Sequence, residues 1–404
     1  MALTDLCCSH CGIFRPIFCT LAGMECTSES YAHRVRRGVG LVILAIMFSS
    51  LAFAQDAFKS IEVHPDRTVT FKYRAPGAKE VLFAMEGAKP VAMAKDDSGT
   101  WAYTSQTLEP DYYGYSFIAD GVFSMDPDNP NIKPNLISPQ SVFHVAGNTP
   151  EPWEVADVPH GTVHHKFYKS DVIGDQRDYY VYTPAGYDPR AKTTYPVFYL
   201  LHGYSDDASG WTSVGKANVI FDNLIAQGKV KPMVVVMTLG YGAPEILLKK
   251  WAAWGDAELR ERNFNRYREA LLKEMLPRIA KEYRVSTKQE DRAIAGLSMG
   301  GSESLMAGLN NPDKFGWVGA FSSGGLGDDF AARFPSVDKK INSQLKLLWI
   351  SCGTDDGLIK PNRELFDWLK TKEVKFTPVE TAGAHTWMVW RRNLVNFAPL
   401  LFQK

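Results

Sequence analysis

A serine between two closely spaced glycines is the clearest chemical signal in this chain. The stretch Ala-Ile-Ala-Gly-Leu-Ser-Met-Gly-Gly places Ser298 between Gly296 and Gly300 in a G-x-S-x-G pattern. Such glycines allow a sharp turn from strand to helix that exposes the serine hydroxyl. Because the pattern also occurs in purely structural turns, its flanks matter: a buried strand is predicted at residues 291–295 and a helix at residues 302–309. Together they predict that Ser298 is a nucleophile.

A single histidine follows this serine, and it is the candidate base. His385 lies in Thr-Ala-Gly-Ala-His-Thr-Trp, after a predicted strand at residues 375–380 and before an amphipathic terminal helix. In α/β-hydrolases the chain order is nucleophile, acid, histidine, which this position satisfies. The alternative is an ordinary solvated loop histidine.

The acid of such a site should lie between these two residues. A predicted buried strand at residues 345–352 runs into Gly-Thr-Asp-Asp-Gly, which offers Asp355 and Asp356. One would accept a hydrogen bond from the imidazole, while the other could cap the following helix. The pattern alone leaves the two open.

At these motifs the chain resembles the esterase D-like enzymes of carbohydrate esterase family 1, which include feruloyl and acetylxylan esterases. The resemblance rests on Ala-Gly-Leu-Ser-Met-Gly-Gly, Cys-Gly-Thr-Asp-Asp and Gly-Ala-His-Thr-Trp, and it covers most of residues 160–404. In that family the acid is the second position after Gly-Thr. The resemblance therefore assigns the role to Asp356, with Asp355 as the alternative.

The same family resembles this chain at Phe-Tyr-Leu-Leu-His-Gly-Tyr-Ser, residues 198–205, an apolar strand that ends in a glycine loop. The resemblance implies that this is the first oxyanion loop. The backbone NH groups of Tyr204 and Met299 would then hold the negative oxygen of a tetrahedral intermediate. His202 is predicted to shape the loop rather than act as a second base.

The resemblance implies a serine carboxylesterase that works through an acyl-enzyme, and this mechanism needs no metal and no organic cofactor. Its expected partners are an ester-substituted plant cell-wall polysaccharide such as xylan, an oligosaccharide, or a small aryl ester. One alternative is a siderophore hydrolase of the enterochelin esterase type. Others are an acyltransferase resembling the mycolyltransferases, and an inactive carbohydrate-binding protein.

Several aromatic residues are candidates for the substrate pocket. Tyr241, Trp251 and Trp254 lie in a stretch predicted to be irregular, residues 240–265, which follows a strand on the side where α/β folds bind ligands. Trp387 lies beside the candidate base, where loop packing is an equally good interpretation.

Strands that alternate with helices predict the fold that positions these residues. The alternation indicates a mostly parallel sheet and an α/β-hydrolase fold over residues 164–404. The predicted elements are strands at 180–183, 197–201 and 233–237 and helices at 217–227 and 267–282.

The preceding region, residues 56–148, has short alternating runs separated by turns, which predict a small all-β sandwich. It resembles the early-set, immunoglobulin-like domains found ahead of esterases. A linker at residues 149–163 could hold the sandwich over the active site or merely tether it. The aromatic residues Trp101, Tyr112, Tyr113 and Phe123 could stack on sugars, but a core role is the preferred interpretation.

Residues 1–54 are interpreted as a leader with a secretory signal peptide. A basic segment at 33–37 and an apolar segment at 38–54 precede a predicted cleavage after Ala54, so we expect a secreted or periplasmic protein. A retained membrane anchor is the alternative, and translation could instead start at Met24. Five of the six cysteines lie in this leader, which leaves Cys352 and no disulfide in the mature chain.

Composition is consistent with a globular enzyme. The 404 residues are 45% hydrophobic, and 45 basic residues balance 45 acidic ones. This balance does not favour nucleic acid or acidic membranes as partners, and we expect no stable membrane partner after leader removal.

Overall fold

The computed structural model describes residues 58–403. The predictions for the leader, including its cleavage site, its alternative start and its five cysteines, lie outside the described residues. Across residues 58–403, no helix is both long enough and apolar enough to cross a bilayer.

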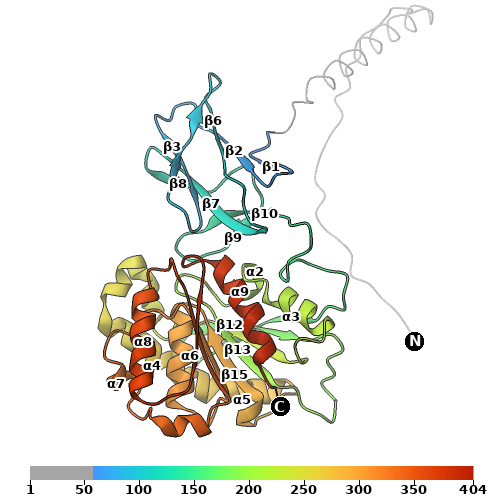
Figure 1. Cartoon of the computed structure of the whole chain (residues 1–404), viewed down its shortest axis with the longest axis vertical. Coiled ribbons are helices and arrows are strands. Elements are labelled where there is room, and N and C mark those ends of the chain that lie inside the picture. The colour runs from blue at the N-terminus through green and yellow to red at the C-terminus, as the bar shows by residue number, and fades with distance from the viewer. Residues whose placement is uncertain (1–57, 404) are drawn as a thin grey trace, which may run out of the picture. The chain divides into compact units, whose positions relative to one another are not determined.

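An eight-stranded sheet organises the larger, C-terminal part of the chain (Figure 1). Its order is β11-β12-β14-β13-β15-β16-β17-β18, in which β12 is antiparallel to both its neighbours, β11 and β14, and all the other pairs are parallel. This confirms the predicted α/β fold with a mostly parallel sheet. The strands are β11 (Thr162–Lys169), β12 (Gln176–Thr183), β13 (Val197–Leu201), β14 (Val234–Thr238), β15 (Arg292–Gly296), β16 (Trp317–Phe321), β17 (Leu347–Gly353) and β18 (Thr377–Thr381).

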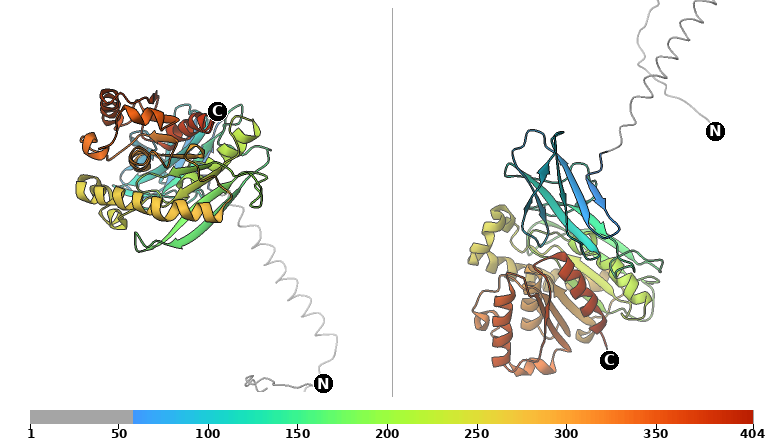
Figure 2. Two further views of the ribbon diagram at one scale, coloured as in Figure 1. Left: turned by 90° about the horizontal axis from the view of Figure 1, so that it is seen from below. Right: turned by 45° about the horizontal axis from the view of Figure 1, so that its top comes forward.

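Helices cover both faces of this sheet, because its central strands are apolar on both sides. Along β13, Tyr199 and Leu201 face one hydrophobic cluster, whereas Phe198 and Leu200 face another. The first cluster includes α4 (Ala257–Ala270), α5 (Leu276–Glu282), α6 (Met299–Asn310) and α8 (Ile359–Thr371), and the second includes α3 (Ala217–Ala226) and α9 (Trp387–Phe397). The run from α4 to α5 lies along its face of the sheet (Figure 2).

The segment predicted to be irregular, residues 240–265, is mostly helical. A 3₁₀ segment, η1 (Pro244–Gly255), is interrupted at Lys250, and α4 begins directly after Asp256. The Asp256 side chain caps α4 by accepting a hydrogen bond from the Leu259 amide at 3.0 Å. The prediction started the helix ten residues too late because the first turns of α4 carry many charged and few apolar residues.

Two antiparallel sheets form what we call the N-terminal β-region, residues 59–148. One has the order β1-β2-β6-β5 and the other β4-β3-β7-β10-β9, with β8 paired to β7. The bounds are β1 (Ile61–Val63), β2 (Val69–Arg74), β3 (Val81–Met85), β4 (Val91–Ala92), β5 (Ala94–Lys95), β6 (Thr100–Thr104), β7 (Asp111–Ala119), β8 (Val122–Ser124), β9 (Ile132–Lys133) and β10 (Gln140–Val145). This region and the large sheet belong to one compact unit, Lys59–Lys404.

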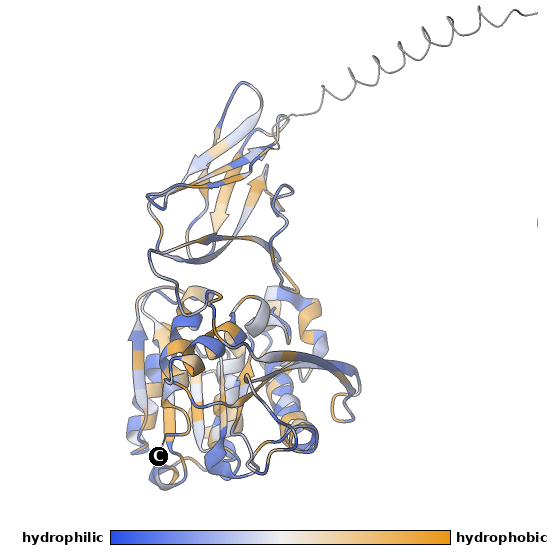
Figure 3. Ribbon diagram, turned by 90° about the vertical axis from the view of Figure 1, so that its right-hand side faces the viewer, coloured by the Kyte–Doolittle hydropathy of each residue, from blue (hydrophilic) through white to orange (hydrophobic). Residues whose placement is uncertain are grey.

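Aromatic side chains fill the core between these two sheets. Trp101 and Tyr113 are buried in it, as the core interpretation requires, whereas Phe123 is exposed. Tyr112 stacks on His144 at the edge of the region. Figure 3 shows hydrophobic strands set between hydrophilic loops in both parts of the fold.

The predicted linker is packed rather than free. Trp153 is only 3% exposed and belongs to one of the two hydrophobic clusters of the large sheet. On either side of it, the carbonyls of Pro152 and Glu154 accept hydrogen bonds from the Asn223 amide group at 2.9 and 2.8 Å. The segment is therefore fixed to α3 before β11 begins.

Candidate active site

Ser298 lies in the sharp turn between β15 and α6. Its backbone φ of 52° is unusual for a residue other than glycine, and its amide donates to the carbonyl of Phe321 at 2.8 Å. A Cβ at Gly296 would lie 2.5 Å from the Gly300 carbonyl oxygen, and one at Gly300 would lie 2.4 Å from the His202 carbonyl oxygen. Both glycines are therefore required by the close packing of this turn.

Three of the predicted residues meet in one chain of hydrogen bonds. His385 Nε2 lies 3.0 Å from Ser298 Oγ, and His385 Nδ1 lies 2.8 Å from Asp356 Oδ2. The loops that follow β15, β17 and β18 supply these side chains, so the parallel sheet brings them to the same edge. With Nδ1–H donating to the carboxylate, Nε2 can accept the serine proton.

The structure distinguishes the two adjacent aspartates. Asp356 is buried, which would raise its pKa, but the hydrogen bond and charge of His385 outweigh burial and the pKa is lowered. Asp355 points elsewhere, and its Oδ2 accepts a hydrogen bond from the Gly383 amide at 3.3 Å. The predicted division of labour was wrong in one respect: Asp356 also accepts from the Leu358 amide at the start of α8.

The two backbone amides predicted to form an oxyanion hole lie on either side of the nucleophile turn. Met299 is the first residue of α6. Tyr204 follows β13, and a Cβ at the adjacent Gly203 would lie 3.3 Å from Ser298 Cβ, so this loop passes close to the serine. The Tyr204 hydroxyl donates to the carbonyls of Ile246 and Lys250, which holds the side chain against η1.

His202 is buried beneath the same loop. Its Nδ1 donates to the Gly203 carbonyl at 2.7 Å, and its Nε2 accepts from the Gly240 amide at 2.9 Å. Burial lowers the pKa of this imidazole to about 4. His202 therefore stays neutral and joins two loops, the shaping role that its position predicts.

A pocket of about 800 Å³ opens at Ser298. One part of its lining is aromatic and includes Trp251, Trp254 and Trp387, three of the four predicted pocket residues. The fourth, Tyr241, is 1% exposed, and its hydroxyl donates to the Asp206 carbonyl at 2.8 Å. The prediction for Tyr241 is corrected because the backbone at Gly242 packs directly on α4, which draws the preceding tyrosine into the core.

Sequence reasoning missed several other lining residues. They come from strands, helices and loops far apart in the sequence and include Lys133, Asn135, Gln140, Arg260, Leu358 and Trp390. No spacing pattern connects them to Ser298, so only the tertiary structure reveals them. Three of them belong to the N-terminal β-region.

Within the described part of the chain, no group of three or more His, Cys, Asp or Glu side chains is placed to hold a metal ion. Cys352 is a free, buried thiol, and burial raises its pKa to about 12.

Comparison with known proteins identifies the family of this chain. The family model named Esterase matches residues 170–401, more than half of the chain. The chain belongs to the Esterase family. The matched segment holds the sheet from β12 to β18, the nucleophile turn and both other members of the hydrogen-bond chain.

The sequence relatives of this Esterase family chain include two esterases. An endo-1,4-beta-xylanase/feruloyl esterase of Xylanibacter ruminicola is 29% identical over 348 residues, 84% of this chain and 46% of the relative. The chain thus spans about half the length of that protein. An acetyl esterase of Caldicellulosiruptor saccharolyticus is 24% identical over 232 residues, 49% of this chain and 80% of the relative. These relatives and the family identify residues 170–401 as a carboxylic ester hydrolase domain.

Solved structures share the fold. The enterobactin esterase of Shigella flexneri has a TM-score of 0.63 at 19% identity and covers 82% of this chain and 92% of its own. A CE1 ferulic acid esterase of Anaeromyces mucronatus has a TM-score of 0.53 at 23% identity and covers 63% of this chain and 96% of its own. Both likenesses support the α/β-hydrolase assignment.

Proposed function

We propose that this protein is an exported serine esterase that hydrolyses feruloyl or acetyl esters of plant cell-wall polysaccharide. The observation that carries the proposal is the hydrogen-bonded chain from Ser298 through His385 to Asp356, set in a pocket of about 800 Å³.

In the proposed reaction His385 Nε2 takes the proton of Ser298 as its Oγ attacks the ester carbonyl. The amides of Tyr204 and Met299 would stabilise the negative oxygen of the tetrahedral intermediate. His385 then gives the proton to the departing alcohol, and water clears the acyl-enzyme by the same steps. Asp356, kept ionised by its lowered pKa, would stabilise the imidazolium form of His385.

The two sides of the pocket support a substrate with an aromatic and a hydroxylated part. Trp251 and Trp254 offer apolar ring surface, which suits the flat acyl group of a ferulate. Polar residues of the N-terminal β-region line another part, which suits a sugar. The name of the Xylanibacter ruminicola relative, which includes feruloyl esterase, supports the same substrate class.

A siderophore ester is the second candidate substrate. The structural likeness to the enterobactin esterase extends over 82% of this chain, against 63% for the ferulic acid esterase. Because it covers more of this chain, the likeness to the enterobactin esterase favours an architecture that the two proteins share and that includes the N-terminal β-region.

The test compares the protein with its Ser298→Ala variant on methyl ferulate, acetylated xylan and enterobactin. We expect turnover of the first two, and a loss of about 10⁶ in kcat in the variant. Ser304→Ala is the matched control, because this hydroxyl lies further along α6 and only donates to the Gly300 carbonyl. Turnover of enterobactin alone would select the second candidate, and equal rates for Ser298→Ala and the parent would overturn the nucleophile.

The predicted export is tested separately from the esterase activity. If the leader is cleaved as predicted, the mature protein begins at Gln55, which N-terminal sequencing of the secreted or periplasmic protein would detect.

A further inference from the structure

The N-terminal β-region is hydrogen-bonded to the predicted oxyanion loop, residues 202–206. The Leu136 amide donates to the Ser205 carbonyl at 2.7 Å. The Asn135 amide group donates to Ser205 Oγ at 2.9 Å and to Asp206 Oδ1 at 3.1 Å. Backbone and side chain of Ser205 are thus both held from outside the α/β-hydrolase fold.

This loop needs such support because of its conformation. Ser205 has a φ of 72°, in the left-handed region that a residue other than glycine occupies at a cost of roughly 1–3 kcal/mol. Ser205 follows Tyr204 directly, so a change of backbone conformation at Ser205 would shift the loop and with it the Tyr204 amide. The contacts from Asn135 and Leu136 oppose that change.

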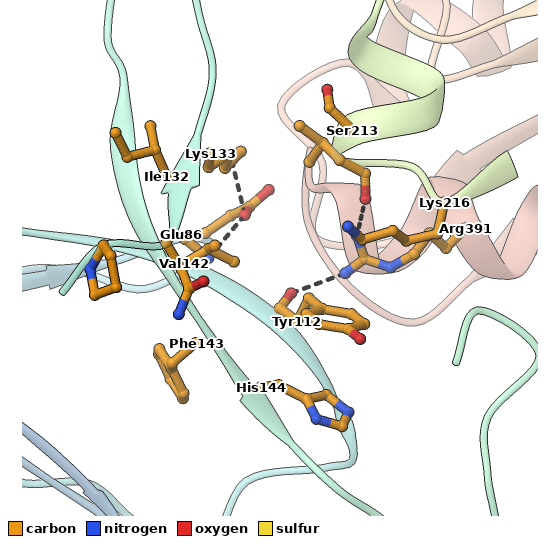
Figure 4. A pocket seen from close by; sticks show the side chains of 14 residues that line it. Glu86, Tyr112, Ile132, Lys133, Val142, Phe143, His144, Ser213, Lys216 and Arg391 are labelled. Atoms are coloured by element: carbon orange, nitrogen blue, oxygen red, sulfur yellow. Dashed lines mark hydrogen bonds and ion pairs between the residues drawn. The ribbon is translucent and has the colours of Figure 1, made fainter. Parts of the chain in front are cut away.

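The same region also contacts the loop of the candidate base. Glu86 Oε1 accepts a hydrogen bond at 2.9 Å from the amide of Trp387, two residues after His385. Burial would raise the pKa of Glu86, but the charge of Lys133, 2.8 Å away, outweighs it, so the pKa is lowered and Glu86 stays ionised. Figure 4 shows Glu86 and Lys133 together with Arg391 of α9.

A buried ion pair fixes the region against α9. Arg391 donates to Asp111 Oδ1 from Nε at 3.0 Å and from a terminal nitrogen at 2.5 Å, and their side chains are 1% and 0% exposed. Arg391 also donates to the carbonyls of Tyr112 and Val214 (Figure 4). With this anchor in place, the loop that carries Asn135 has a defined position relative to the oxyanion loop.

We propose that Asn135 is a positioning residue for the esterase reaction, which fixes Ser205 and thereby aims the Tyr204 amide at the oxyanion. This inference rests on the proposed function. Loss of a whole oxyanion donor costs about 10²–10³ in kcat, so misalignment of one donor should cost about 10- to 100-fold.

Asn135→Asp is the most selective variant for testing the hydrogen bonds from Asn135 to Ser205 and Asp206. Asn135 Oδ1 accepts from the amides of Ile137 and Ser138 at 3.0 and 2.8 Å, and an aspartate keeps these bonds and the local turn. It removes only the NH₂ group that binds Ser205 and Asp206. Asn135→Ala separates this loss from the added charge, and Asn148→Asp adds the same charge at an exposed position of the same region.

We expect both Asn135 variants to lower kcat on 4-nitrophenyl acetate by about 10- to 100-fold with KM nearly unchanged, and the Asn148 control to match the parent. Phosphorylation of Ser298 by diisopropyl fluorophosphate should slow in parallel, since it also places charge on an oxygen in the hole. Equal thermal unfolding would show that the variants are folded. An unchanged kcat and phosphorylation rate would overturn the proposal. A parent that is phosphorylated but hydrolyses none of the esters would overturn the proposed function alone.

Three polar side chains lie together above Gly114 on β7. A Cβ there would lie 2.7 Å from Gln140 Oε1, 2.9 Å from Lys133 Cδ and 3.1 Å from Glu86 Oε2. The bare glycine leaves room for these three side chains, and all of them line the pocket at Ser298. Lys133 donates to Gln140 Oε1 at 3.1 Å, whereas no acceptor for the Gln140 NH₂ group is found among residues 58–403.

We infer that this cluster, with Gln140 as its free donor, forms a subsite for the sugar portion of the substrate. Lys133 and Glu86 offset each other's charge, which suits a neutral, hydroxyl-rich ligand. This inference also rests on the proposed function.

Calorimetry on the Ser298→Ala protein tests the subsite without turnover. We expect feruloylated xylo-oligosaccharide to bind about 10-fold more weakly after Gln140→Ala, with methyl ferulate binding unchanged, and Gln106→Ala, at an exposed position of the same region, to have no effect. Equal weakening for both ligands, or for neither, would overturn the subsite. Retained binding without hydrolysis by the parent would instead count against the proposed esterase activity.

Discussion

The two sides of the active-site pocket are built in different ways. On the α/β side, Ser298, Asp356 and His385 follow three parallel strands, whose ends meet at one edge of the sheet. On the side of the N-terminal β-region, antiparallel hairpins present Glu86 and Asn135, which form hydrogen bonds to the catalytic loops. The parallel sheet thus brings the reacting groups together, while the N-terminal β-region determines how firmly their loops are held.

Replacing the acid should show the largest effect on the α/β side after loss of the nucleophile itself. We expect Asp356→Asn to lower kcat by about 10⁴, because the imidazole would lose the carboxylate that fixes its tautomer. Asp355→Asn is the matched control one position away and should change kcat by less than a few-fold. Steady-state kinetics on an aryl acetate measure both, and a larger loss in the Asp355 variant would reverse the assignment.

Breaking the buried ion pair tests the other side. Arg391→Met leaves Asp111 buried with Arg392 as its remaining cationic partner, so the free energy of unfolding should fall by about 3–5 kcal/mol. Arg392 lies 3.0 Å from the same carboxylate but is 43% exposed, and Arg392→Met should cost less than about 1 kcal/mol. Urea denaturation compares the two, and similar losses would contradict the role given to burial.

Acid should weaken the junction of loops around His202. The pKa of His202 in the folded protein, about 4, lies below the ordinary value of 6.5. The imidazole therefore binds its proton more tightly in the unfolded chain than in the folded protein. The contribution of His202 to the free energy of unfolding is present in full above pH 6.5 and is lost as the pH falls towards 4. The loss is about 3 kcal/mol at most. Asp206 acts oppositely, since burial raises its pKa to about 7 and its contribution is lost as the pH rises from about 4 to 7.

The His202→Gln variant isolates the first of these contributions. Subtracting its free energy of unfolding from that of the parent, at pH values from 4 to 7.5, should leave a difference that grows with pH and levels off above 6.5. A flat difference would contradict the lowered pKa of His202.

The aromatic side of the pocket should show the smallest effect. Trp251→Ala removes ring surface from the pocket, and we expect KM for methyl ferulate to rise about 10-fold with methyl acetate unaffected. Leu248→Ala is the control, because this side chain is 84% exposed and lies outside the pocket lining. Equal effects on both esters would remove Trp251 from acyl recognition.

Much of the α/β side could be predicted because its chemistry is local in sequence. The glycines around Ser298 define a strand, a turn and a helix, and the single later histidine leaves no choice of base. Residues 355 and 356 could not be separated from the pattern alone, since which carboxylate faces His385 depends on the path of the loop after β17. Tyr241 was misplaced for a similar reason, because its neighbour packs on a charged helix that the periodicity did not reveal.

The contribution of the N-terminal β-region could not be predicted. Its strands follow from alternating patterns, but Asn135 and Ser205 are 70 positions apart, and no motif links them. The packed segment around Trp153 also escaped notice, because its proline and acidic residues are typical of a free linker. Contacts of this kind depend on how two folded surfaces fit, which no local pattern encodes.

The ion pair between Asp111 and Arg391 spans 280 positions of the chain, and this separation bears on the order of assembly during synthesis. The strands around Asp111 leave the ribosome long before the helix that carries their partner. A chain that stopped after residue 386 would contain Ser298, Asp356 and His385, yet Asp111 would have no arginine to meet. The active site therefore reaches its final form only after synthesis has passed α9.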